Sequence, residues 1–261
     1  MGRLLESVAT VSTPLLWLDD TAYAGRLLAG GHPPWNDVSA AIAHMRRALG
    51  LLRSDVAAID LRPVLQSWLA AHPALQTDLQ QVARPERVIR RLLEEPALQA
   101  HLVALVQGVD AASAGRPVAL VMPGPLGWLR AQAPNEEVDE DAIDAVAVYM
   151  AAFLRAFGGV RLDALLLDER TAPTPPDLRE PLLNLARHYR WDFGRRLSVV
   201  EDDGSDGFVI APQGGLGVEL GASFWAGAPV SAVAGGGFRF TEIPVDEVPE
   251  TVLARLRPLW R

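Results

Sequence analysis

Two apolar runs, PVALVM (117–122) and LDALLLD (162–168), flank a segment of helical period at 137–157 and decide the fold of this chain. In the middle segment, apolar residues recur at spacings of three and four, which places them on one face of a helix. A helix of this length between two short apolar strands is typical of a βαβ unit, in which the two strands are parallel. The core of the chain is therefore expected to be a parallel sheet.

The same alternation of strand and helix extends outward to both ends of the chain. Strands are expected at 15–19, 56–61, 117–122, 162–168, 197–201, 207–211, 230–234 and 238–243. Helices are expected at 37–53, 62–72, 84–108, 137–157 and 176–195. Eight strands alternating with helices indicate an α/β fold, a (β/α)8 barrel of the TIM type.

The connections between strands become short and Gly-rich after residue 197, so the C-terminal half of the barrel is expected to be degraded. An open parallel sheet that ends in an antiparallel hairpin fits the same pattern almost as well. No linker or internal repeat divides the chain, and residues 1–261 are expected to form a single barrel-like domain.

Composition places the chain among soluble globular proteins. Of its 261 residues, 49% are hydrophobic and 21% are charged, which is ample for a core. Its longest apolar runs fall short of the roughly 18 residues that a membrane span needs. The N-terminal residues contain no sustained apolar stretch followed by a cleavage site, so we expect a cytoplasmic protein with no membrane partner.

The charged residues exclude several classes of chemistry. All 24 cationic residues are Arg, and the chain contains neither Lys nor Cys. Without Lys, the chain cannot anchor pyridoxal phosphate (PLP) or form a Schiff base, and without Cys it cannot hold an iron–sulfur (Fe-S) cluster or a zinc–thiolate site. Because the net charge is −8 and the arginines are scattered, a nucleic-acid partner is not expected. The sequence requires no cofactor, and which cofactor is used, if any, is unknown.

Carboxylates and arginines follow several expected strands, at the end of the sheet where parallel α/β folds build their sites. These positions are Asp19-Asp20, Asp60-Leu61-Arg62, Met122 to Pro125, Asp168-Glu169-Arg170, Glu201 to Asp203, and Gln213. A cluster of carboxylates raises some of their pKa values by repulsion and so pairs a general acid with a general base. We expect Asp60, Asp168 and Glu169 to be catalytic. Arg62 and Arg170 are expected to bind a carboxylate of the substrate. The alternative is that these acids only cap the helices that follow them.

A Pro-rich loop, GGHPPWND (30–37), contains the one histidine that does not lie in a helical stretch. His32 is a candidate catalytic acid or base near neutral pH, and Trp35 beside it is a candidate substrate-binding residue. The other histidines, including His44, are expected at surface or boundary positions of helices. No histidine pair has the spacing of a metal site, and no metal is expected.

The glycine cluster GGLGVELG (214–221) could open a short helix and bind a phosphate or carboxylate, or it could form tight turns and close contacts. Its spacing is not that of a dinucleotide-binding fingerprint. No serine sits in a GxSxG elbow, so a hydrolase triad is not expected.

The segment from Arg116 to Arg170, about a fifth of the chain, resembles the uroporphyrinogen decarboxylase and cobalamin-independent methionine synthase superfamily. Gly124-Pro125 at the end of one strand and Asp168-Glu169 at the end of the next match the positions of the Gly-Pro and Asp-Glu motifs of that superfamily. The resemblance implies a (β/α)8 barrel whose mouth binds a substrate for decarboxylation or methyl transfer, with Gly124 and Pro125 at the substrate. The methionine synthases, however, have Pro after Asp-Glu and bind zinc through His and Cys. This chain has Arg170 there and no Cys.

Three functions follow as hypotheses. The first is a decarboxylase or related lyase that acts on a small carboxylate-bearing substrate. The second is a methyltransferase on the same barrel that works with a corrinoid partner protein. The third is a non-catalytic barrel that binds a ligand or a protein. The sequence leaves the substrate and the oligomeric state open.

Overall fold

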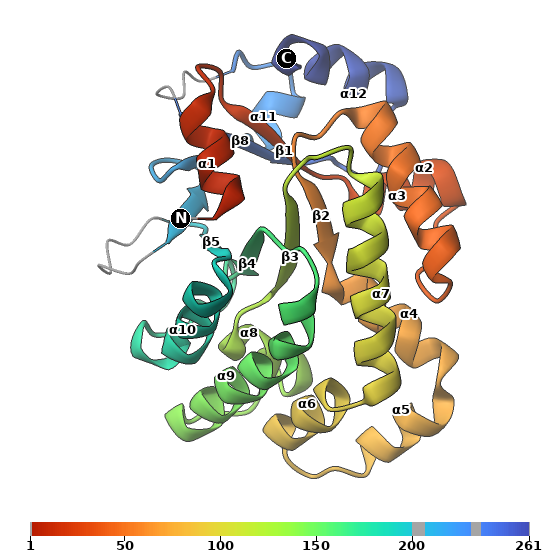
Figure 1. Ribbon diagram of the computed structural model, residues 1–261, viewed down its shortest axis with the longest axis vertical. Helices are drawn as coiled ribbons and strands as arrows, with labels where there is room; N and C mark the ends of the chain where they lie inside the picture. The colour runs from red at the N-terminus through yellow and green to blue at the C-terminus, as the bar shows by residue number, and fades with distance from the viewer. Residues whose placement is uncertain (1, 200–206, 231–235, 261) are drawn as a thin grey trace.

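Eight parallel strands form the centre of the protein (Figure 1). The computed structural model describes residues 2–199, 207–230 and 236–260. The strands are β1 (Leu15–Asp19), β2 (Ala57–Asp60), β3 (Val118–Pro123), β4 (Ala164–Asp168), β5 (Asp192–Arg196), β6 (Phe208–Ala211), β7 (Gly217–Glu219) and β8 (Phe238–Glu242). Their order is β1-β8-β7-β6-β5-β4-β3-β2, and the chain is therefore an α/β protein with a nearly closed (β/α)8 barrel of the TIM type.

The C-terminal half of the barrel is reduced, as the sequence indicates. Residues 212–216 alone link β6 to β7, and α11 (Ala222–Trp225), between β7 and β8, has four residues. The alternative of an open sheet with a terminal antiparallel hairpin is wrong, because β8 pairs in parallel with both β7 and β1.

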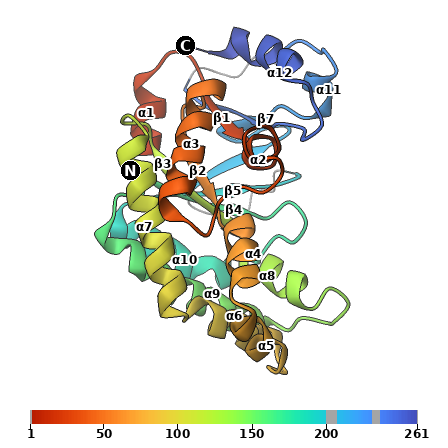
Figure 2. The same ribbon diagram turned by 90° about the vertical axis from the view of Figure 1, so that its right-hand side faces the viewer.

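Most of the helices lie on the outside of the barrel, and α1 lies at its N-terminal end (Figures 1 and 2). Besides α11 they are α1 (Arg3–Thr10), α2 (Thr21–Ala29), α3 (Val38–Leu52), α4 (Leu61–Ala71), α5 (Pro73–Gln80), α6 (Pro85–Leu93), α7 (Pro96–Ala112), α8 (Pro125–Gln132), α9 (Glu140–Leu154), α10 (Glu180–Tyr189) and α12 (Pro249–Leu256), with short 3-10 turns at Arg155–Gly159, Asp177–Arg179 and Arg257–Leu259. The helix expected at 84–108 is two helices, because Pro96 starts a new one at α7.

The fifth strand lies earlier than the sequence pattern predicts. The expected helix at 176–195 ends at Tyr189, where Arg190 takes a left-handed φ of 59°. Residues 192–196 then form β5, so the strand expected at 197–201 is wrong over its described part. Every residue of β5 is buried although its sequence is DFGRR. Because arginine is rarely buried, a search for apolar runs does not identify this strand.

The seventh strand also differs from the prediction. Val230 lies in no strand, and the rest of the expected strand at 230–234 lies outside the described residues. The structure instead places β7 within the glycine cluster. A Cβ at Gly217 would lie 2.6 Å from Cγ1 of Ile210, so glycine is needed there for β7 to pass close to β6.

The interior of the barrel is apolar below its mouth. Its inward-facing side chains form one cluster that includes Leu15, Trp17, Val56, Ala119, Ala164, Leu166, Phe208, Ile210, Phe238 and Phe240. Leu4 and Val8 of α1 join this cluster and close the N-terminal end of the barrel. Asp192 at the start of β5 holds α1 there, because its carboxylate accepts the N–H groups of Gly2 at 2.6 Å and Leu5 at 2.9 Å.

A second and larger apolar core lies between the strands and the outer helices. Its most apolar helix is α9 with the turn that follows it. These residues, Glu140–Gly159, are long and apolar enough to cross a membrane by length and composition, and 44% of an apolar 18-residue window within them is buried in the protein. Ile143, Val146 and Met150 of α9 belong to the outer core. Core helices of barrel proteins have the same length and composition, and α9 packs as such a core helix.

The two end strands, β1 and β2, meet at a seam that side chains close. In the described structure no ladder of backbone hydrogen bonds joins them. Instead the N–H of Asp55 donates to the carbonyl of Leu16 at 2.7 Å, and the Asp55 carboxylate accepts the N–H of Leu16 at 2.8 Å. The hydroxyl of Ser54 donates to the carbonyl of Val56 and accepts the N–H of Leu18. These bonds close the seam at the level of Leu16 and Leu18.

Candidate active site at the barrel mouth

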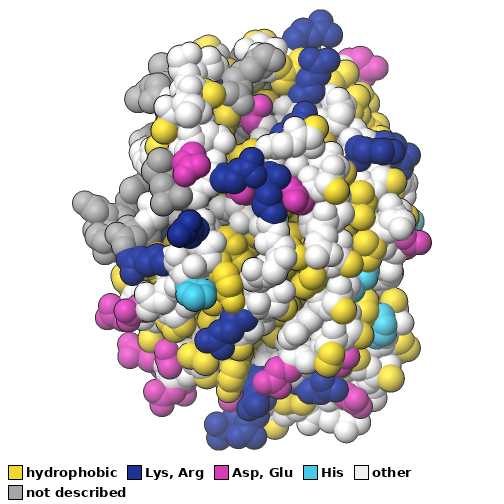
Figure 3. Space-filling view, viewed as in Figure 1, with side chains coloured by type: hydrophobic (Ala, Val, Ile, Leu, Met, Phe, Trp, Pro, Cys, Tyr) yellow, Lys and Arg dark blue, Asp and Glu magenta, His cyan; other side chains and the backbone are white. Residues whose placement is uncertain are grey.

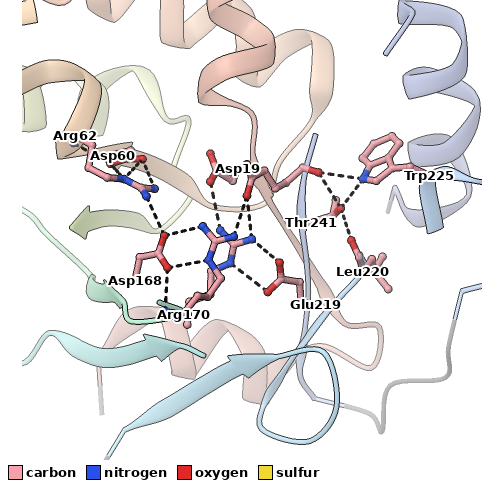
Figure 4. A network of polar contacts seen from close by, with 11 residues as sticks. Asp19, Asp60, Arg62, Asp168, Arg170, Glu219, Leu220, Trp225 and Thr241 are labelled. Atoms are coloured by element: carbon pink, nitrogen blue, oxygen red, sulfur yellow. Dashed lines mark hydrogen bonds and ion pairs between the residues drawn. The ribbon is translucent and has the colours of Figure 1, made fainter. Parts of the chain in front are cut away.

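A ring of charged residues lies at the C-terminal end of the barrel. Side chains alternate along each strand, so the residue two positions after an inward-facing apolar residue also faces inward. Following Trp17, Leu166 and Phe240, this pattern brings Asp19, Asp168 and Glu242 to the mouth. The charged ring consists of the last residues of β1, β2, β4, β5, β7 and β8, namely Asp19, Asp60, Asp168, Arg196, Glu219 and Glu242. Figure 4 shows several of these side chains converging with Arg62 and Arg170.

Asp168 is held by two arginines. Its carboxylate accepts bonds from Nε and Nη2 of Arg170 at 2.9 and 2.8 Å, and it lies 3.1 Å from Nη1 of Arg62. Burial favours the neutral carboxyl, but the hydrogen bonds and charge of Arg170, with the charges of Arg62 and Arg196, outweigh it and hold the pKa of Asp168 below its usual value. Asp168 is therefore ionised at neutral pH.

Asp60 joins the same group through Arg62. The Nη2 of Arg62 lies 2.7 Å from the Asp60 carboxylate, which also accepts the backbone N–H of Arg62 at 2.9 Å. Asp60 thus caps α4 and takes part in the charged ring at the same time. Capping and a position in the mouth are compatible, because the helix starts directly above the strand end.

Arg196 forms the floor of the mouth. Its guanidinium is paired with Glu219, lies 3.2 Å from Glu242 and 3.6 Å from Asp19, and stacks 4.3 Å above the Phe240 ring. The residue is only 2% exposed. A buried guanidinium shared by three carboxylates fixes their positions.

Asp19 is a carboxylate of the ring whose pKa is raised. Burial, with repulsion from Asp60 and Glu242, raises the pKa of Asp19 to about 6 against the opposing charges of Arg196 and Arg62. Its neighbour Asp20 has a pKa raised to about 7 by burial and by the charge of Asp19. A carboxyl group with a pKa near 6 can both donate and accept a proton near neutral pH.

A cavity of about 890 Å³ opens over this ring. Its walls include Asp19, Asp60 and Glu242 from the ring, and Arg62 and Arg170, which pair with it. His32 and Trp35 from the loop after α2 and residues of α2 and α4 complete the walls. The volume lies within the range of ligand pockets, about 300–1,000 Å³. The mouth therefore combines room for a small molecule with convergent charged groups.

The structure brings together most of the site residues expected from the sequence. Asp60, Arg62, Asp168 and Arg170 lie in one network of ion pairs. The exposed His32 and the buried Trp35 line the cavity beside it. The backbone carbonyl of Trp35 also contacts Nε2 of His101 at 2.7 Å, which anchors the loop to α7.

Glu169, Gly124 and Pro125 lie apart from this cavity. The next position along a strand faces the opposite side, so Glu169 points outward under the loop that follows β4. It is 1% exposed, lies 3.2 Å from Nη1 of Arg179, and accepts the N–H of Thr174 at 3.2 Å. Burial, opposed by these partners, raises the pKa of Glu169. A Cβ at Gly124 would lie 2.9 Å from Cγ of Glu169, so the Gly-Pro turn packs on this buried carboxylate.

The sequence pattern does not assign Arg196, Glu219 or Glu242 to the site, and it places Asp19 at a strand end without a role. Arg196 and Glu219 were missed because their strands were misplaced. The available signal was alternation: Phe238, Phe240 and Glu242 are spaced by two, as are Leu15, Trp17 and Asp19. Two other strand-end positions were expected from the sequence. Gln213 is exposed in the link after β6, and Glu201 to Asp203 lie outside the described residues.

One histidine lies elsewhere than expected. His44 is 2% exposed, so its expected surface or boundary position is wrong.

Metal sites and surface charge complete the description. Within residues 2–199, 207–230 and 236–260, no group of three or more His, Asp or Glu side chains could hold a metal ion. On the face seen in Figure 3, basic and acidic side chains are interspersed.

The sequence matches no model of a known protein family. It also matches no curated protein.

Proposed function

We propose that this protein is an enzyme that performs acid–base chemistry of the lyase type, such as decarboxylation, on a small carboxylate-bearing substrate in the barrel mouth. The observation that carries the proposal is the convergence of Asp19, Asp60, Arg62 and Arg170 on a cavity of about 890 Å³. Asp168, beside the cavity, pairs with both arginines. Charged groups placed at strand ends in a cavity of this size are typical of enzyme sites on barrels.

Arg62 and Arg170 have hydrogen-bond donors left for a substrate carboxylate. A guanidinium carries one N–H at Nε and two at each Nη. In Arg62, Nε and Nη2 bond Asp60 while Nη1 contacts Asp168, so one N–H of each Nη remains. Arg170 is arranged in the same way between Asp168 and Glu242. The side chains are 43% and 31% exposed, so these donors are accessible from the cavity.

Asp19 is the proposed general acid. In a decarboxylation the bond between the carboxylate carbon and its neighbour breaks, carbon dioxide leaves, and the electron pair stays on the remaining carbon. Protonated Asp19 donates its proton to that carbon, and water then reprotonates the carboxylate. A substrate of this kind carries its own electron-withdrawing group. The ionised Asp168 orients the arginines and does not donate a proton.

Measurements of turnover and of substrate binding distinguish the role of Asp19 as a proton donor from the role of Arg62 and Arg170 as substrate-binding residues. A panel of small carboxylic acids that carry an electron-withdrawing group is tested for binding by calorimetry and for carbon dioxide release. Asp19→Asn is expected to keep the Kd of a bound acid and to lower turnover by about 100-fold or more, the usual contribution of a general acid. Arg62→Gln and Arg170→Gln are each expected to weaken binding by about tenfold or more, since a hydrogen bond to a charged group is lost.

Arg90→Gln is the matched control, because Arg90 is an exposed arginine of α6 that pairs with Glu94 outside the mouth. It is expected to change neither binding nor turnover. If no acid binds, or if acids bind equally to the protein and to both mouth arginine variants, the proposal is wrong.

A further inference from the structure

A small chamber lies behind the wall of the mouth, between the β1–β2 seam and helices α2 and α3. Its volume is about 20 Å³, which is room for about one water molecule. Thr21, Trp35 and Asp60 line both this chamber and the mouth cavity. The chamber therefore adjoins the proposed substrate site.

Two residues that line the chamber carry buried ring nitrogens without a hydrogen-bond partner within the described residues. These nitrogens are Nε1 of Trp35 and Nδ1 of His44, in residues that are 6% and 2% exposed. The two rings meet edge to face with centroids 5.7 Å apart. A buried polar atom without a partner is costly, and native proteins usually satisfy such atoms with water or ligand.

Asp20 supplies an acceptor on the same wall. It precedes α2, but its carboxyl group makes no capping hydrogen bond. Burial raises its pKa to about 7, and in either protonation state it keeps an acceptor oxygen.

The backbone of the open part of the seam also faces the chamber. In parallel strands, alternate residues direct their N–H and C=O groups to the same neighbour. Ala57 donates its N–H towards β3, to Pro117, so Ala58 directs its backbone groups towards β1. Leu18 donates its N–H to Ser54 across the seam, so its carbonyl points there too. Leu18 and Ala58 both line the chamber.

These groups select one kind of occupant. The indole N–H of Trp35 requires an acceptor, whereas the Leu18 carbonyl requires a donor, and Asp20 offers an acceptor oxygen in either protonation state. An anion would leave the Leu18 carbonyl without a donor, and an ammonium group would leave the indole N–H unbonded. A hydroxyl accepts and donates at once, and it fits the volume.

We propose that the chamber is a hydroxyl-binding subsite of the mouth, which holds a water molecule in the free protein and the hydroxyl of a hydroxy acid in the complex. The position of Asp60 argues for the second occupant, because Asp60 lines the chamber and directly bonds Arg62, the proposed carboxylate ligand. A hydroxyl and a carboxylate on one small molecule can then occupy both positions. The inference rests on the proposed function for its carboxylate end only.

A high-resolution crystal structure of the free protein tests the first occupant. A single ordered water is expected within hydrogen-bond distance, about 2.7–3.2 Å, of Trp35 Nε1 and His44 Nδ1. An empty chamber would overturn the proposal.

Paired acids test the second occupant. Glycolate, 3-hydroxypropionate and 4-hydroxybutyrate are compared with acetate, propionate and butyrate, and the Kd of each acid is measured by calorimetry in the parent protein and in each variant. In the ¹⁵N-labelled parent protein, the indole N–H resonance of Trp35 also reports occupancy of the chamber. At least one hydroxy acid is expected to bind about three- to tenfold more tightly than its partner, which is the value of one hydrogen bond. This preference is expected to disappear in Trp35→Phe. Equal binding within every pair would overturn the proposal.

Trp128→Phe is the matched control. Trp128 is also 6% exposed with an unpartnered Nε1 within the described residues, but it lies on α8 and not on the chamber wall. This variant is expected to keep the preference, and loss of the preference in both variants would overturn the proposal. If no acid binds at all, the carboxylate site of the proposed function is wrong, and glycerol then decides the subsite. A glycerol-dependent shift of the Trp35 resonance upholds it, and no shift overturns it.

Discussion

Nη2 of Arg196 on β5 lies 3.2 Å from Oε2 of Glu242 on β8, and this contact joins two strands that are not neighbours in the sheet. The same guanidinium pairs with Glu219 and lies 3.6 Å from Asp19. One buried arginine thus holds the ends of β1, β5, β7 and β8 together beneath the mouth. The described connections after β5 are short, so this ion-pair cluster does part of the work that helices do elsewhere in the barrel.

Replacing Arg196 by Met is expected to lower the free energy of unfolding by about 3–5 kcal/mol, because three carboxylates lose their buried partner. Urea denaturation followed by circular dichroism measures the change. Arg90→Met, at an exposed pair, is expected to leave the free energy of unfolding nearly unchanged. A cost below about 1 kcal/mol for Arg196→Met would show that the cluster does not hold the barrel end.

Gly124→Ala is expected to destabilise the protein by about 1–3 kcal/mol, because the new Cβ overlaps the buried Glu169 side chain. Gly50 in α3 is the matched control, since a Cβ there meets nothing within 4 Å. Gly50→Ala is expected to stabilise the protein by about 0.5–1 kcal/mol through helix propensity. Thermal unfolding of the two variants compares them, and equal shifts would contradict the close packing at Gly124.

Asp20 is expected to make the protein less stable as pH rises. Its pKa in the folded protein is about 7, above the ordinary aspartate value of 3.8. The folded state therefore holds the proton more tightly than the unfolded state between these values, and stability falls as pH increases from about 4 to 7. Asp20→Asn removes this dependence.

At pH 7 we expect Asp20→Asn to be more stable than the parent by about 1–2 kcal/mol, given that the Asp20 side chain keeps part of its surface in solvent. At pH 4 the two should be alike. Urea denaturation across this pH range measures the difference, and parallel curves for the two proteins would contradict the raised pKa.

Ser54→Ala is expected to cost about 1–3 kcal/mol, because the backbone groups of Leu18 and Val56 at the seam lose a buried partner. Ser54 is 1% exposed. Ser39→Ala, at an exposed position of α3, is the control and is expected to change stability by less than about 0.5 kcal/mol. Hydrogen exchange of the Leu18 amide gives a local readout. Unchanged protection in Ser54→Ala would show that the seam is not closed by this hydroxyl.

The first four strands and the arrangement around them were predictable, because their apolar runs and flanking helices follow the expected periods. From β5 onward the prediction fails at β5 and β7. Each of these strands contains residues that strands usually avoid: two buried arginines in β5 and a glycine in β7. The buried Arg196 is tolerated because it pairs with carboxylates across the mouth. Gly217 is tolerated because the absence of a side chain lets β6 pack closely against β7. The residues that make these contacts lie outside the strand pattern that a sequence window covers.

The sequence by itself determined a largely parallel α/β sheet, the excluded lysine and cysteine chemistry, and the expectation that Asp60, Arg62, Asp168 and Arg170 lie at one end of that sheet, since the carboxyl ends of parallel strands meet there. The closure of the sheet into a barrel was decided by the structure, in which β8 pairs in parallel with both β7 and β1. The tertiary structure alone decided that Asp168 faces the mouth while Glu169 is buried behind it, that Asp19 has the raised pKa, and that Trp35 and His44 share a polar chamber. The physical reason is that burial and charge repulsion depend on neighbours brought together from distant strands, whereas periodicity depends only on residues near in the chain.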